Sequence, residues 1–209
     1  MEKVREISLI LKKLYPFSKT ALKFENPFQL LIATILSAQT TDEQVNKVTA
    51  ELFKKFKTPW DFASADINEL TKLIKSVNFY KNKAKYIKKV SQSIIKEFNG
   101  KVPDKLEDLT KLPGVARKTA NVVLSQAFKK AEGIVVDTHV KRVSYRLGLT
   151  KNTDPEKIEK DLMKILPKAE WIDFPFRLIL FGRNICKSKN PDCNNCPLYK
   201  LCLTKGKEK

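Results

Sequence analysis

The feature that most constrains the fold of this chain is a nearly continuous series of helix start and stop signals. Asn26 and Pro27 supply an N-cap and a first-position proline, and apolar side chains then recur at helical spacing. Thr41-Asp42-Glu43-Gln44 has the form of a capping box. A long helix is expected over 80–98, and the β-prone run 134–136 is short. The sequence therefore predicts an all-α fold, with further helix starts at Thr58, Asp66, Asp137 and Asp154.

A Pro-Gly turn between two predicted helices is the most informative local motif. A short helix runs from Asp104 into the segment 112–120, LPGVARKTA, and a second helix is expected from about Ala116 to Lys129. Gly114 can adopt positive φ, which lets the chain reverse and leaves backbone N–H groups facing outward at a helix start. Such groups can hold a DNA phosphate without reading sequence. A plain turn between helices is the alternative.

Lys118 and Asp137 are the candidate reactive groups. Lys118 lies in the first turn of the second helix, and a free lysine is protonated at neutral pH. Burial or a neighbouring cation such as Arg117 would have to favour the neutral amine, and we expect a buried amine. Asp137 is most simply a helix N-cap, and Lys118 alone reads more simply as a solvated or phosphate-binding lysine. Catalysis requires the two groups to meet in space.

The charge balance indicates a polyanionic partner. Lys plus Arg total 41 against 23 Asp plus Glu, a net charge of +18. The most apolar stretch, 28–38, is shorter than the roughly 20 residues that span a bilayer. The first residues lack the hydrophobic region of a signal peptide. We therefore expect a cytoplasmic protein that binds nucleic acid rather than membrane.

Four cysteines are confined to the last part of the chain. They read Cys186-x6-Cys193-x2-Cys196-x5-Cys202, which favours a metal site in a reducing compartment over a secreted disulfide scaffold. Four thiolates suit either zinc or a [4Fe–4S] cluster, and the spacing leaves the choice open. Lys187 and Lys189 lie in the same loop, where a bound ion could hold them against phosphate.

Taken together, the segment 112–120, the element at Asp137, the cysteine spacing and the segment 35–42, ILSAQTTD, resemble the endonuclease III family. The resemblance runs from about Asn26 to Cys202 in the family's order. It implies a helix-hairpin-helix DNA glycosylase fold of two helical domains with an interdomain cleft and an iron–sulfur loop at the C-terminus. A six-helix domain would span 20–131, with its hairpin at about 105–129. Residues 1–19 and 132–209 would form the domain that holds a [4Fe–4S] cluster on the four cysteines.

The resemblance also assigns site residues. Lys118 would be the Schiff-base nucleophile and Asp137 the essential carboxylate. Gln39 would fill the space left by a flipped base, and Phe79 would be a wedge, although either could instead be structural. Further DNA contacts would come from the hairpin and the cysteine loop, at Gly114, Val115, Ala116, Lys187 and Lys189.

The chain departs from the family pattern at two positions. Ala116 stands where the hairpin usually has a second glycine, so its backbone should avoid strongly positive φ. Asn78 replaces the usual glycine before the wedge. A set of lysines that follows it could be a phosphate-binding face or a solvated helix surface: Lys81, Lys83, Lys85, Lys88 and Lys89.

The implied function is removal of damaged, oxidised pyrimidines from double-stranded DNA, followed by cleavage of the abasic site by β-elimination. The enzyme would be a monomer associated with the nucleoid. One alternative is a monofunctional mismatch glycosylase of the same superfamily, but those relatives lack a lysine at the position of Lys118. The other is a non-catalytic DNA-binding module with a structural metal.

Overall fold

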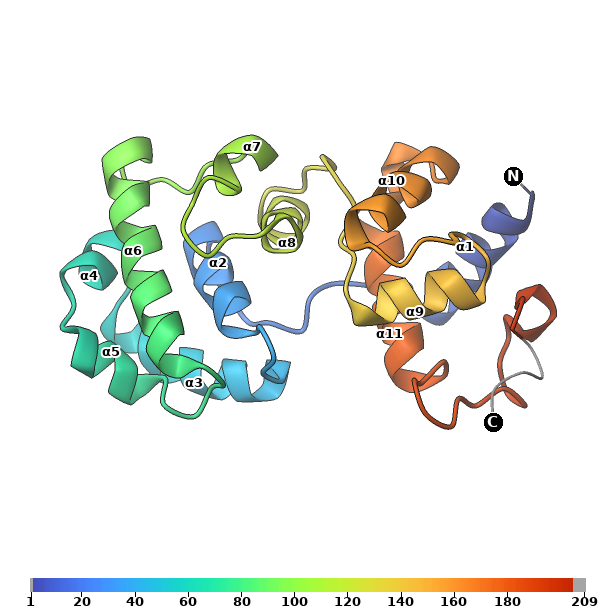
Figure 1. Ribbon diagram of the computed structural model, residues 1–209, viewed down its shortest axis with the longest axis horizontal. Coiled ribbons are helices and arrows are strands. Elements are labelled where there is room, and N and C mark those ends of the chain that lie inside the picture. The colour runs from blue at the N-terminus through green and yellow to red at the C-terminus, as the bar shows by residue number, and fades with distance from the viewer. Residues whose placement is uncertain (1, 205–209) are drawn as a thin grey trace. The chain divides into compact units, whose positions relative to one another are not determined.

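The computed structural model describes residues 2–204, and every regular element among them is a helix. The chain divides into two compact units, Thr20–Glu132 and Met1–Lys19 together with Gly133–Lys209 (Figure 1). The prediction of an all-α fold is confirmed for the described residues. None of their helices has both the length and the apolar character needed to cross a membrane.

The unit Thr20–Glu132 is organised around one almost fully buried helix, α2 (Pro27–Leu36). A helix that is apolar on all sides must be surrounded by others. Here α2 contacts α3, α6 and α8, and Figure 1 shows it between the last two. The unit has seven helical segments, three of them of seven residues or fewer. Besides α2 they are α3 (Asp42–Lys55), α4 (Pro59–Ser64), α5 (Ile67–Leu73), α6 (Tyr80–Phe98), α7 (Leu106–Leu109) and α8 (Arg117–Ala127).

The helix starts follow the capping residues. Asn26 accepts a hydrogen bond from the backbone N–H of Gln29 at 2.9 Å, and Thr41 accepts one from Gln44 at 3.3 Å. The predicted capping box at Thr41 is only half formed, because the side chain of Gln44 donates to Ser76 Oγ at 2.7 Å. That bond ties α3 to the loop after α5, so tertiary contact replaces the local one. A complete box forms at Thr58 instead.

The second unit packs around a separate apolar core. It contains α1 (Glu2–Leu14), α9 (Thr138–Arg146), α10 (Pro155–Ile165), η1 (Lys168–Glu170), α11 (Asp173–Asn184) and η2 (Tyr199–Leu201). Helix α11 packs against both α1 and α9. The β-prone run 134–136 is buried but pairs with no strand in the described part of the chain. Its first amide, from Ile134, donates to Glu159 Oε1 at 3.1 Å instead.

Candidate functional site

The Pro-Gly turn joins α7 to α8 as a tight hairpin. Leu112 and Val115 are buried on either side of the turn, and the amide of Val115 donates to the carbonyl of Leu112 at 3.1 Å. Gly114 has φ +76°, as its position predicts. Ala116 has φ −78° and ψ 164°, which confirms that its backbone avoids positive φ. The hairpin therefore closes without the second glycine.

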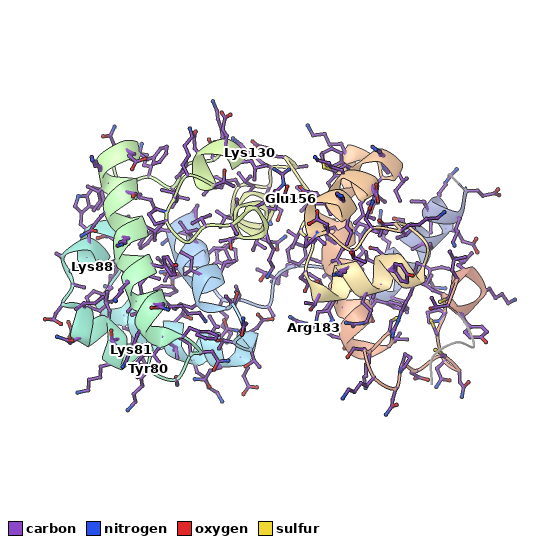
Figure 2. The ribbon with its side chains drawn as sticks, in the orientation of Figure 1. Tyr80, Lys81, Lys88, Lys130, Glu156 and Arg183 are labelled. Atoms are coloured by element: carbon purple, nitrogen blue, oxygen red, sulfur yellow. The ribbon has the colours of Figure 1, made fainter. Side chains whose placement is uncertain are left out.

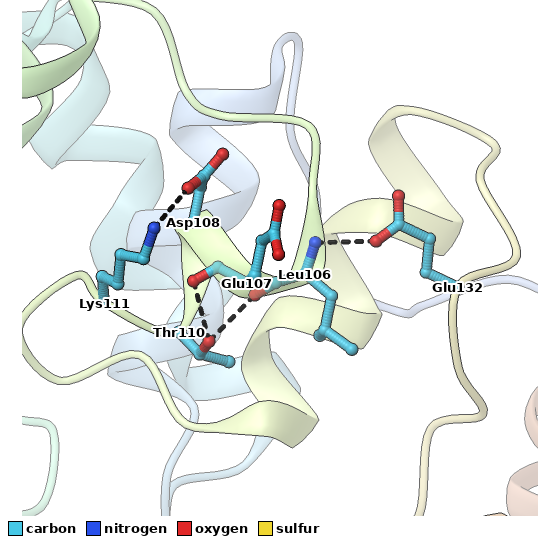
Figure 3. A network of polar contacts seen from close by, with 6 residues as sticks. All are labelled: Leu106, Glu107, Asp108, Thr110, Lys111 and Glu132. Carbon is cyan, nitrogen blue, oxygen red and sulfur yellow. Dashed lines mark hydrogen bonds and ion pairs between the residues drawn. The ribbon is translucent and has the colours of Figure 1, made fainter.

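Side chains fix the short helix α7 in place. The carboxylate of Glu132 accepts from the amide of Leu106 at 2.7 Å. At the other end, the hydroxyl of Thr110 donates to the carbonyls of Leu106 and Glu107 at 3.0 and 3.1 Å (Figure 3). A helix of four residues makes few hydrogen bonds of its own. These contacts therefore set the position from which the turn begins.

Lys118 is the second residue of α8 and its side chain is exposed. The expectation of a buried amine is wrong, because the first turn of α8 lies at the surface of its unit. Ala116 has no side-chain oxygen, and α8 has no side-chain N-cap. The start of α8 therefore receives no hydrogen bond from the side chain of its N-cap residue, and a helix start of this kind favours a bound anion.

Asp137 is the N-cap of α9, as predicted. Its Oδ1 accepts from the amide of Val140 at 2.8 Å, and the residue is half-buried. One carboxylate oxygen is therefore committed to the helix start. Lys118 lies in the unit Thr20–Glu132 and Asp137 in the other unit. Their meeting at one site stays a prediction.

His139 follows Asp137 in the first turn of α9. Burial lowers the pKa of His139, the cations Arg142 and Arg183 lower it further, and Asp137 opposes them. The guanidinium of Arg142 lies 3.2 Å from Nδ1 of the ring. A neutral imidazole with Nδ1 as acceptor fits this geometry.

Gln39 and Phe79 share an unusual geometry. Both side chains are exposed, Phe79 by 62%, and both backbones are left-handed, with φ 54° and 57°. Phe79 is therefore not a core residue. The side-chain amide of Asn78 donates to the carbonyl of Gln39, and the backbone amide of Asn78 donates to Thr40 Oγ1 at 3.2 Å. The two candidate DNA-contacting residues are thus joined through Asn78, although contact with DNA stays a prediction.

The lysines of α6 divide into two groups. Lys83 is 5% exposed, and half-buried Lys88 donates to the carbonyl of Ala65 at 2.6 Å. Figure 2 shows Lys88 on the side of α6 that faces α4 and α5, and Lys81 near the start of the helix. Lys83 and Lys88 are therefore not part of a phosphate-binding face. The exposed lysines of α6 are Lys81, Lys85, Lys89 and Lys96.

All four cysteines line one cavity in the second unit. Within residues 2–204, no three His, Cys, Asp or Glu side chains lie close enough together to hold a single metal ion. Four thiolates can hold either zinc or a [4Fe–4S] cluster. Burial, with the nearby thiols, raises the pKa of Cys196 to about 11. Coordination to a metal would deprotonate it.

Arg146 connects α9 to the cysteine loop. Its guanidinium donates to Cys186 Sγ at 3.3 Å and to the carbonyl of Lys187 at 2.7 Å. Lys187 and Lys189 are exposed beside this contact. The loop is therefore fixed to α9, the helix that Asp137 caps.

Sequence reasoning missed the roles of Lys83, Asn78 and Tyr86. Lys83 stands four residues before Ile87 and seven before Val90, so helical periodicity could have placed it on the buried face of α6. At Asn78 the sequence indicates only a departure from the family pattern. Nothing in the sequence indicates that Tyr86 packs against Gly114.

Comparisons with known proteins agree with these features. Residues 32–168 match the HhH-GPD superfamily of base excision DNA repair proteins. The chain is 52% identical over 201 residues to endonuclease III of Synechocystis sp., covering 96% of this chain and 92% of that protein. It is 47% identical over 206 residues to endonuclease III of Bacillus subtilis, covering 97% and 94%.

Solved structures give the same result. A trapped covalent intermediate of an endonuclease III with DNA aligns with a TM-score of 0.94 and 46% identity, covering 99% of this chain and 97% of that one. A thermostable thymine-DNA glycosylase aligns with a TM-score of 0.89 and 25% identity, covering 99% and 98%.

Proposed function

Because the chain belongs to the endonuclease III family, whose members are DNA glycosylases with abasic-site lyase activity, we propose that Lys118 is its nucleophile and Asp137 its essential carboxylate. The observation that carries this proposal is the exposed lysine in the first turn of α8, four residues after the left-handed Gly114. The substrate is double-stranded DNA with an oxidised pyrimidine or an abasic site.

The reaction begins when the damaged base leaves the duplex, at a cost of a few kcal/mol. The neutral amine of Lys118 attacks C1′ of the deoxyribose, the glycosidic bond breaks and the base departs. Asp137 stabilises the positive charge that develops on the sugar. A proton then passes from the amine to O4′ as the C1′–O4′ bond of the sugar opens, which leaves a Schiff base between Lys118 and C1′. The Schiff base makes the C2′ proton acidic, and loss of that proton breaks the C3′–O bond and releases the 3′ phosphate. A water nucleophile would stop at the abasic site.

In this proposal, bound DNA removes water from the amine of Lys118, which is exposed in the free protein. The first amides of α8 and the turn at Gly114 hold the backbone phosphate next to Lys118. The DNA then covers an amine that is exposed in the free protein, and this desolvation favours its neutral form. The positive charge of Arg117, the preceding residue, also favours the neutral form of Lys118.

The four cysteines are the ligands of a [4Fe–4S] cluster in this proposal. The cavity that they line supports it. When bound, the cluster supplies cross-links that hold the loop, and no catalytic step involves it. It would keep exposed Lys187 and Lys189 placed for phosphate contact, and the protein would act as a monomer on the nucleoid.

A monofunctional mismatch glycosylase is the second candidate, supported by the structural similarity to a thymine-DNA glycosylase. Lys118 separates the two, because hydrolysis without a covalent intermediate needs no amine there.

Borohydride reduction during incubation with a duplex containing thymine glycol tests the proposal. Wild-type protein should form a covalent adduct, and Lys118→Ala should form none. Lys111→Ala is the matched control, because Lys111 is an exposed lysine of the same hairpin whose partner is Asp108. Absence of an adduct with wild-type protein would reject the lyase.

A further inference from the structure

Lys83 is a buried cation without an obvious reason to be charged. Its Nζ donates to the carbonyls of Leu36 and Ala38 at 2.7 and 2.6 Å and to Thr40 Oγ1 at 3.1 Å. All three are neutral oxygens, and burial lowers the pKa of Lys83. A buried charge is unfavourable unless its hydrogen bonds are made. The three hydrogen bonds therefore indicate that Lys83 fixes the positions of the residues that it contacts.

The acceptors of Lys83 lie around a single residue. Leu36 is the last residue of α2, and Ala38 and Thr40 are the two neighbours of Gln39. A cation at this position also complements the negative end of the α2 dipole. Lys83 thus holds the backbone before Gln39 and the side chain of Thr40 after it, and Gln39 itself has a φ of 54°.

Asn78 completes the arrangement from the other loop. Its side chain donates to the carbonyl of Gln39, and its backbone donates to the same Thr40 hydroxyl that Lys83 contacts. Phe79, the next residue, is left-handed and exposed. A glycine at 78 could not make the side-chain bond. This link is therefore a property of this chain's own sequence.

We propose that Lys83 and Asn78 are positioning residues that hold Gln39 and Phe79 ready to enter the base stack when a damaged base leaves it. This inference rests on the proposed function. Gln39 and Phe79 both have left-handed backbones, a conformation that is strained in residues other than glycine. The hydrogen bonds of Lys83 and Asn78 keep them in this conformation before DNA binds. The protein therefore does not have to order both loops at the moment of base extrusion.

Lys83→Met tests this with Lys88→Met as the matched control. Lys88 lies on the same helix and also gives an amine-to-carbonyl bond, but to Ala65 and away from Gln39. Single-turnover base release is measured on two thymine glycol duplexes. In one the lesion faces adenine, and in the other it faces an abasic analogue, so that it is already unpaired.

The expected result is a selective defect. Lys83→Met should release base about tenfold more slowly than Lys88→Met from the paired duplex, and within about twofold from the unpaired one. An equal loss on both duplexes would mean that Lys83 only supports the fold. Equal rates for the two variants would also overturn the inference.

Asn78→Ala keeps the test decisive if Lys83→Met does not fold. It is an exposed position, and we expect about a threefold loss that is confined to the paired duplex. The same rates as wild type on both duplexes would reject the proposed positioning role of Lys83 and Asn78.

Borohydride trapping on a preformed abasic site separates the two proposals. A wild-type protein without an adduct would remove the proposed function and this inference with it. A wild-type adduct combined with no selective defect would remove this inference alone.

Discussion

Gly114 lies directly against the ring of Tyr86. A Cβ built on Gly114 would lie 3.0 Å from two carbons of that ring, so the ring would have to shift by a few tenths of an ångström to admit a side chain. The close approach and the φ of +76° are separate reasons for glycine at this position.

Gly114→Ala should therefore lower stability by about 1–3 kcal/mol from the left-handed backbone alone, with an additional loss from contact with Tyr86. Urea unfolding of Gly114→Ala, Tyr86→Ala and the double variant measures the coupling. The double variant should recover the contact part and not the backbone part. Strict additivity would show that the ring does not restrict residue 114.

Asp137→Asn should separate the helix cap from the charge. Asparagine also caps helices, so α9 and the thermal midpoint should be preserved, while base release falls by about 100-fold or more because the developing charge loses its partner. Asp137→Ala should lose activity and also about 1 kcal/mol of stability. An Asn variant with wild-type rates would assign Asp137 to structure alone.

The salt dependence of DNA binding should report the exposed lysines. With about five phosphate contacts, log K should fall with log salt at a slope near −4.5. Lys85→Gln should reduce that slope by about 0.9, whereas Lys88→Gln should leave it unchanged because its amine is bound to Ala65. A slope near zero for wild type would exclude nucleic acid as the partner.

Acid should destabilise the second unit through His139. Its folded pKa is lowered below the ordinary 6.5, so the unfolded chain takes up a proton first as pH falls. The stability contribution is therefore complete above pH 6.5 and is lost as pH falls through the folded value. His139→Gln should show a smaller loss of unfolding free energy between neutral pH and about pH 5. Identical pH profiles would place the acid sensitivity elsewhere.

The purified protein should contain about four iron atoms and four acid-labile sulfides per chain. Cys193→Ser should lose iron and the accompanying visible absorption. A colourless protein with one zinc per chain would contradict the cluster and favour the zinc alternative.

The sequence was sufficient to predict a hydrogen bond where the two partners lie close together in the chain. Capping at Asn26, Asp137 and Asp154 involves residues three positions away, so each helix start was predictable. The conformation of Ala116 followed in the same way from the cost of positive φ outside glycine.

Signals failed where the partner is distant in sequence. Gln44 bonds with Ser76 rather than with Thr41, and Lys83 reaches back more than forty residues to Leu36 and Ala38. The exposure of Lys118 likewise depends on which side of α8 packs against α2. Tertiary packing decides these contacts, whereas the sequence pattern indicates only which residues share a face of a helix.

The position of Glu132 determines where a fragment of this chain can end. It is the final residue of the unit Thr20–Glu132, and its carboxylate is the acceptor for the first amide of α7. A fragment shortened by one residue would lose the anchor of its hairpin while keeping every residue of the turn itself. Fragments that end at 131 and at 132 would therefore differ in the hydrogen bond that holds the first residue of α7.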